Sequence, residues 1–179
     1  EQFALGGGYE IPLACDLIIG NGKVGLPEKG LGILPGWLGT QTLIRRAGLE
    51  KGLWMILGAE IVEADTPWIN IPLKKTELTW AKLKTIADNT KKRRFEPLKY
   101  NFAQKLLYLG KFFELWYKVK TGKEPASALL ALQAIWRGNN QDLQAAAGIE
   151  WQAILAAFET KEAEKGIRHF LETGKHLYK

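Results

Sequence analysis

Two neighbouring stretches decide the fold of this chain: 4-ALGGGYEIPLACDLIIG-20 and 24-VGLPEKGLGILPGWLGTQTLIRRAG-48. Glycines at 6–8 precede a carboxylate at Glu10, and a second carboxylate, Glu28, follows Pro27. Glycine lets the backbone approach a ligand closely, and a helix N-terminus presents free amides and the positive end of its dipole. The first stretch therefore predicts a helix that runs to about Ala14 and can stabilise a developing negative charge at its start.

Short strands and helices are expected around the two carboxylates. Residues 16–19 have the pattern of a short buried strand, residues 20–22 that of a turn, and residues 24–26 that of a brief partner strand. Residues 29–35 read as a loop. The helices expected in this part of the chain are 36–46, 49–57 and a short one from Glu63 to about Trp68.

From Thr76 onward the pattern is almost entirely helical. Helices are expected at about 76–90, 98–119, 125–137, 141–158 and 160–173. The helix at 125–137 is apolar on most faces and is expected to be buried. The helix at 98–119 has an amphipathic stripe with spacings of three and four: Phe102, Leu106, Leu109, Phe113, Trp116 and Tyr117.

The composition limits the possible chemistry. The chain of 179 residues is 46% hydrophobic and 25% charged, as expected of a soluble globular protein. Its one cysteine, Cys15, cannot form an internal disulfide and is expected to be a packed small side chain. No cluster has metal-ligand spacing, so no metal site is expected, and the chemistry falls to carboxylates and backbone amides. Asp16 is expected to have a structural role.

The charge and the N-terminal residues give weaker information. The net charge of +6 and the cluster 91-KKRR-94 would suit a phosphate-bearing ligand, but an exposed surface is the more economical interpretation. Nucleic-acid binding is disfavoured because no aromatic and basic platform accompanies the cluster. Neither a membrane span nor a signal core is visible, and the opening EQFALGGG suggests a piece of a longer chain. The expected location is the cytoplasm, or the mitochondrial matrix in a eukaryote.

Residues 4–64 resemble the enoyl-CoA hydratase/isomerase (crotonase) superfamily, on the stretches ALGGGYE, CDLII, GLPEKGLGILPG and GTQ. The resemblance implies an α/β fold with few short strands. Residues 1–75 would form the C-terminal part of a crotonase-like ββα spiral, and residues 76–179 a helical segment. It also implies hydration of trans-2-enoyl-CoA to 3-hydroxyacyl-CoA in fatty-acid β-oxidation. The substrate would be a coenzyme A thioester, with no covalently bound cofactor.

The resemblance also implies a role for particular residues. Glu10 would deprotonate the attacking water, Glu28 would exchange the proton at the α-carbon, and the Gly7 amide would lie in the oxyanion hole. Gly36 would help to seat the water. The residues expected to line the substrate are Gly6, Leu26, Pro27 and Trp37. The simpler interpretations remain open: Glu10 would only complement the helix dipole, and Glu28 would be an exposed loop residue.

The sequence also departs from the family pattern. Trp37 and Leu38 replace small residues in 35-PGWLGTQ-41, and the turn between the two glutamates is about two residues shorter than usual. A shift of two preserves which face of a strand a side chain takes. The family's next strand is replaced by 65-DTPWINIP-72, where Trp68 and Ile69 are the candidates for its role.

A second, weaker resemblance covers 120–175, which is similar to the linker of the fatty-acid β-oxidation multifunctional enzyme. It implies a dehydrogenase domain downstream, with NAD required only there, and a thiolase subunit as a possible partner. The missing N-terminal half of the hydratase domain would supply a second oxyanion amide. Enoyl-CoA isomerisation and a non-catalytic acyl-CoA-binding or assembly module are the alternatives to hydration.

Overall fold

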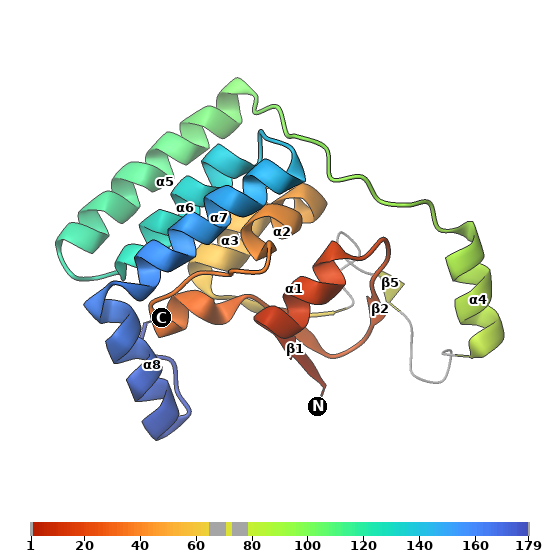
Figure 1. Cartoon of the computed structure of the whole chain (residues 1–179), viewed down its shortest axis with the longest axis horizontal. Coiled ribbons are helices and arrows are strands. Elements are labelled where there is room, and N and C mark those ends of the chain that lie inside the picture. Colours follow the sequence, from red (N-terminus) through yellow and green to blue (C-terminus); the bar gives the residue numbers. More distant parts are fainter. Residues whose placement is uncertain (1, 65–70, 73–78, 179) are drawn as a thin grey trace.

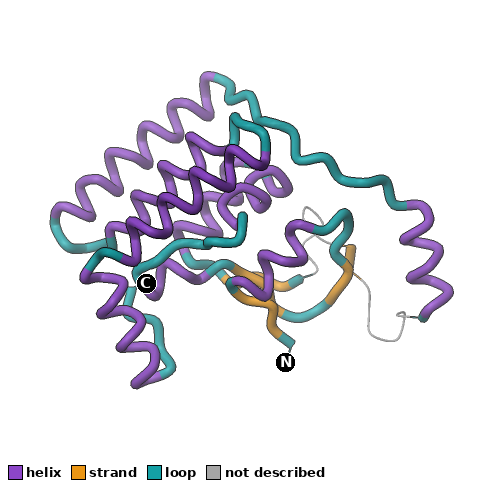
Figure 2. Tube along the Cα trace, viewed as in Figure 1, coloured by secondary structure: helices purple, strands orange, loops and turns teal. Residues whose placement is uncertain are grey.

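A computed structural model describes residues 2–64, 71–72 and 79–178 (Figure 1). The elements of the first part are β1 (Phe3–Leu5), α1 (Gly7–Ala14), β2 (Ile19–Gly20), β3 (Lys23–Gly25), a 3-10 helix η1 (Pro27–Leu31), α2 (Gly39–Ala47), α3 (Leu49–Gly58), β4 (Ile61–Glu63) and β5 (Ile71–Pro72). The second part contains α4 (Trp80–Asn89), α5 (Phe102–Lys120), α6 (Ala126–Gly138), α7 (Leu143–Phe158) and α8 (Lys161–Thr173). Short strands precede a mostly helical half, as predicted (Figure 2).

A small sheet carries the start of α1. Its order is β1-β3-β4, with β1 parallel to β3 and β4 antiparallel to β3. Phe3 lies opposite Lys23, and Gly6 continues the pairing by donating its amide to the Gly25 carbonyl at 3.0 Å. The sequence analysis did not identify β1. This strand sets the direction in which the N-terminus of α1 points.

The prediction of a strand at residues 16–19 is mostly wrong. Only Ile19 and Gly20 form a strand, β2, and its partner is β5 rather than residues 24–26. Of residues 24–26, only Val24 and Gly25 lie in a strand, β3, which pairs with β1 and β4.

Hydrogen bonds hold the segment after α1 away from the larger sheet. The Arg46 guanidinium donates to the Leu13 carbonyl at 2.7 Å and also to the Cys15 carbonyl. The Arg93 amide donates to Asp16 Oδ1 at 2.6 Å, so the structural role predicted for Asp16 is confirmed. Cys15 is exposed, because it lies beyond the end of α1, and the prediction of a packed side chain is wrong.

Two other boundaries differ from the prediction. Residues 27–31 form a 3-10 helix that overlaps the start of the loop expected at 29–35, because Pro27 supplies the φ angle of a first turn; Gly32, with φ 75°, ends it. Glu63 ends strand β4 instead of beginning a helix. The remainder of that predicted helix, with Trp68 and Ile69, lies outside the described residues.

The long helices form a layer over α2 and α3 (Figure 1). Among the described residues, one hydrophobic core contains side chains from both sides of the expected boundary at residue 75, from Tyr9 in α1 to Ile135 in α6 and Ala157 in α7. The predicted burial of α6 is confirmed.

The stripe predicted on α5 faces outward. The exposed residues include Phe102, Leu106, Leu109, Phe113, Trp116 and Tyr117. The opposite face of α5 packs instead, with Leu115 buried and the Tyr108 ring stacked on Trp136 at 4.2 Å. Because α5 is apolar on both faces, the spacing alone could not identify the buried one.

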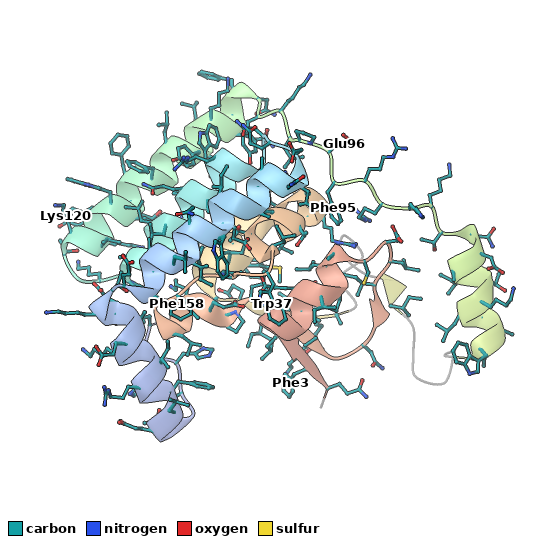
Figure 3. The ribbon with its side chains drawn as sticks, viewed as in Figure 1. Phe3, Trp37, Phe95, Glu96, Lys120 and Phe158 are labelled. Carbon is teal, nitrogen blue, oxygen red and sulfur yellow. The ribbon has the colours of Figure 1, made fainter. Side chains whose placement is uncertain are left out.

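The segment between α4 and α5 contains the basic cluster 91-KKRR-94. The structure ties this segment to the first part of the chain, since Arg93 binds Asp16 and the Phe95 ring lies 5.6 Å from the Arg46 guanidinium (Figure 3). None of the described helices combines the length and apolar character that crossing a membrane requires.

Candidate active site

Glu10 is a buried carboxylate in the first turn of α1. Its side chain is 3% exposed, and its Oε1 accepts the amides of Trp37 at 2.7 Å and Gly39 at 2.8 Å. Burial raises the pKa of Glu10, and the amides of Trp37, Gly39 and Gly36 act against that rise. Glu10 is therefore not an exposed residue that only complements the helix dipole.

Glu28 is a buried carboxylate of a different kind. It lies in the first turn of η1, is 9% exposed, and its Oε2 has no hydrogen-bond partner among the described residues. Burial, followed by the charge of Glu10, raises the pKa of Glu28 to about 8. Glu28 is not an exposed loop residue, and at neutral pH it holds a proton.

The glycines at 6–8 bring the carboxylates to the start of α1. Gly6 has φ 56°, and a Cβ added to it would lie 3.0 Å from Glu28 Oε1. Gly7 is the first residue of α1, where helix amides lack partners within the helix. A Cβ on Gly7 would lie 3.6 Å from the Trp37 ring, which is 65% exposed. Figure 3 shows Trp37 between α1 and the layer of long helices.

The other predicted site residues lie around these groups. Leu26 is fully buried beneath Gly39, and Pro27 begins η1 just before Glu28. Gly36 packs so tightly that an added Cβ would lie 2.2 Å from Ile154 Cδ1. The structure thus brings Gly6, Gly7, Gly36 and Trp37 next to the two glutamates, with Leu26 and Pro27 directly behind.

The turn at residues 36–39 explains why α2 begins at Gly39 and not at Gly36. Leu38, with φ 74°, takes a left-handed conformation that is uncommon for a leucine. A left-handed residue between two amides lets both converge on one anion, and here the Trp37 and Gly39 amides converge on Glu10. Because these amides donate to the Glu10 carboxylate, the regular helix α2 starts only at Gly39.

We predict that Gly39→Ala displaces Glu10. An added Cβ would lie 2.7 Å from Glu10 Oε1 and 2.7 Å from Pro35 Cβ, so one of these groups must move. The expected cost in unfolding free energy, measured by urea denaturation, is about 1–3 kcal/mol. Gly8→Ala is the matched control, since a Cβ there meets nothing within 4 Å. Equal stability of the two variants would contradict the geometry of this turn.

A third buried carboxylate, Glu150 of α7, was not predicted from the sequence. It is 1% exposed, and it accepts hydrogen bonds from the Leu38 amide and from both the amide and the hydroxyl of Thr40. One signal could have found it, because Glu150 is the only charged residue of α7 (LQAAAGIEWQAILAAF). A lone carboxylate in so apolar a helix calls for a buried partner.

The GTQ motif is also explained by the fold. Thr40 binds Glu150, while the Gln41 amide donates to the Thr40 hydroxyl at 2.8 Å and to the Ala134 carbonyl at 3.1 Å. The motif thus ties α2 to both α6 and α7. No group of three or more His, Cys, Asp or Glu residues able to hold a metal ion occurs in the described part of the chain.

The geometry agrees with the comparisons with known proteins. Residues 2–66 match the family model described as enoyl-CoA hydratase/isomerase. Over these residues the chain resembles the enoyl-CoA hydratase/isomerase family. A short-chain-enoyl-CoA hydratase of Clostridium acetobutylicum is 31% identical over 179 residues, covering 97% of this chain and 57% of the relative. The chain therefore spans less than two thirds of the length of this hydratase.

The similarity in fold to solved structures extends beyond residue 66. The solved structure of carnitinyl-CoA hydratase from Mycobacterium avium aligns with 99% of this chain and 59% of its own, with a TM-score of 0.62 and 18% identity. The expected crotonase-like α/β fold is thereby confirmed. A β-oxidation multifunctional protein of Brassica napus is 48% identical over 67 residues, 36% of this chain and 9% of the relative. Similarity to the Clostridium hydratase thus covers more of this chain than this match does.

Proposed function

We propose that this chain carries the acid/base pair of an enoyl-CoA hydratase, which adds water to trans-2-enoyl-CoA to give 3-hydroxyacyl-CoA in fatty-acid β-oxidation. The observation that supports this most is the pair of buried carboxylates at the start of α1, whose surroundings differ. Backbone amides hold Glu10, while Glu28 keeps an unpartnered oxygen and a pKa of about 8. Such a difference separates a base from an acid.

The proposed reaction uses one carboxyl group in its ionised form and the other in its protonated form. Glu10, in its ionised form, takes a proton from water as the water oxygen bonds to the β-carbon. The electron pair of the carbon–carbon double bond moves toward the α-carbon and the thioester carbonyl. Glu28 delivers its proton to the α-carbon, and a proton returning from Glu10 to Glu28 restores the starting state. The Gly7 amide stabilises the negative charge that develops on the thioester oxygen.

A complete oxyanion hole would need a second amide. Relatives of the hydratase/isomerase family carry sequence that this chain does not match, since the chain covers 57% of the Clostridium hydratase. We propose that a segment of this kind, an N-terminal half of the domain, supplies the second donor and the rest of the coenzyme A site. Each such donor contributes about 3–4 kcal/mol to the transition state.

Two features support extensions of this proposal. Glu28 beside the α-carbon position would also run Δ3,Δ2-enoyl-CoA isomerisation in its ionised form, by taking a proton from the α-carbon and returning it to the γ-carbon. The 67-residue match to the Brassica multifunctional protein supports a larger, multifunctional chain, and the linker resemblance of residues 120–175 is the reason to propose a dehydrogenase domain or a thiolase partner. NAD would be needed only in such a domain.

We predict that the 179 residues alone hydrate crotonyl-CoA at no more than about 1% of the rate of the chain supplied with the second donor, because one missing donor costs ~10²–10³ in rate. The assay is loss of the ultraviolet absorbance of the enoyl thioester. Robust turnover by the chain alone would contradict the proposal that a second segment supplies one donor of the oxyanion hole. No turnover by either form, with Glu10 and Glu28 intact, would overturn the hydratase proposal and favour a non-catalytic acyl-CoA-binding module.

A further inference from the structure

Glu150 has no part in the reaction proposed above, yet it is the most deeply buried of the three carboxylates discussed, at 1% exposed. Burying a carboxylate in a helix without charged neighbours costs several kcal/mol unless hydrogen bonds compensate for lost water. Its position in the middle of α7 is 110 residues from Thr40 in sequence, and the packing of α7 on α2 brings the two together.

The hydrogen bonds of Glu150 interleave with those of Glu10. Of four successive amides, those of Trp37 and Gly39 bind Glu10 Oε1, whereas those of Leu38 and Thr40 bind the two oxygens of Glu150. The turn is therefore held from both sides by carboxylates on different helices. Any movement of Leu38 away from Glu150 must rotate the peptide groups that carry the Trp37 and Gly39 amides.

A second contact from α7 fixes the same turn. Ile154, one helical turn after Glu150, fills the space beside Gly36, where an added Cβ would lie 2.2 Å from its Cδ1. The left-handed Leu38 between these anchors is an unfavourable conformation that surrounding contacts must enforce. Glu150 and Ile154 together provide such contacts.

We propose that Glu150 is a positioning residue: by binding the Leu38 and Thr40 amides, it holds the turn whose other two amides orient the base Glu10. The inference rests on the proposed function only for the role of Glu10 as the base, and the geometry of the turn does not depend on that function. Glu150 also acts electrostatically. Burial raises the pKa of Glu150 to about 7, and its charge is among the causes that raise the pKa of Glu28. The charged side chains that act on one another around this turn are Glu10, Glu28 and Glu150.

The test is Glu150→Gln, because a glutamine side chain can accept only one of the two backbone amides and presents a donor to the other. We expect amide hydrogen exchange at Trp37 and Gly39, which Glu150 does not touch, to become at least ~10-fold faster. In the hydrating protein we expect kcat to fall about 10–100-fold with little change in KM, since misplacing a base affects the chemical step. The carboxyl NMR titration of Glu28 should move below about 8. Glu159→Gln, at the exposed end of α7, is the matched control and should change none of these.

A purely local role would give a different pattern. If exchange increases only at Leu38 and Thr40, with Trp37, Gly39, kcat and the Glu28 titration as in the control, the proposal is overturned. Should Glu150→Gln fail to fold, Thr40→Val removes one bond to Glu150 and should accelerate exchange at Trp37 and Gly39 to a smaller degree; unchanged exchange there would equally overturn it. Exchange does not require turnover. A protein that never hydrates crotonyl-CoA but shows the exchange pattern would disprove the proposed function and leave the positioning role in place.

Discussion

Glu10→Gln is expected to lower the rate of crotonyl-CoA hydration by about 10²–10⁴-fold. A glutamine cannot take a proton from water, and a positioned general base contributes roughly 10²–10⁴ in rate. The fold should survive, because the glutamine oxygen can still accept the Trp37 and Gly39 amides. Steady-state kinetics of the hydrating protein measure the loss.

The control for this change is Glu114→Gln, a surface glutamate of α5 that pairs with Lys111 and Lys118 and lies far from the site in the sequence. It should retain its rate, because exposed ion pairs contribute little. An unaltered hydration rate in Glu10→Gln would refute the assignment of Glu10 as the base.

Glu28→Gln is expected to remove activity and, at alkaline pH, to stabilise the protein. Burial raises the folded-state pKa of Glu28 from its ordinary 4.5 to about 8. Between these values the folded state binds more protons than the unfolded state, so the unfolding free energy falls as pH rises and levels off above pH 8. Glutamine removes this loss. The variant should be more stable than the wild type by on the order of 3 kcal/mol at pH 9, and nearly equal at pH 4.

Urea denaturation at the two pH values measures this difference. Glu159→Gln should follow the wild type at both. The same titration predicts that hydration declines above about pH 8, where Glu28 loses the proton that it must deliver. A stability difference that does not depend on pH would show that the pKa of Glu28 is the same in the folded and unfolded states.

Much of the site could be predicted because its signals are local. The glycines at 6–8, Glu10 one turn later and Glu28 after Pro27 are contiguous features whose physical roles can be stated from the sequence. The helices from α5 to α8 were predicted within a few residues because their apolar spacing and caps are local too; the Asn101 side chain, for example, caps α5 by accepting the Gln104 amide at 2.9 Å.

The failures concern partners that are distant in sequence. β1 is three residues long and becomes a strand only by pairing with β3, twenty residues later. Hydrogen bonds from Arg46 and Arg93 hold the segment after α1 away from the larger sheet, and no local sequence pattern indicates these bonds. The failure to predict the burial of Glu150 has the same cause. A glutamate in a helix is ordinarily exposed, and only the packing of α7 on α2 buries this one.

The central claim is that Glu28 holds a proton at neutral pH while Glu10, bound by backbone amides, serves as the base. A carbon-13 NMR titration of the glutamate side-chain carboxyls tests it directly and needs no substrate. We predict that the Glu28 carboxyl titrates at about 8, and that Glu10 ionises at a lower pH than Glu28. Titration of Glu28 near its ordinary value of 4.5 would contradict this claim.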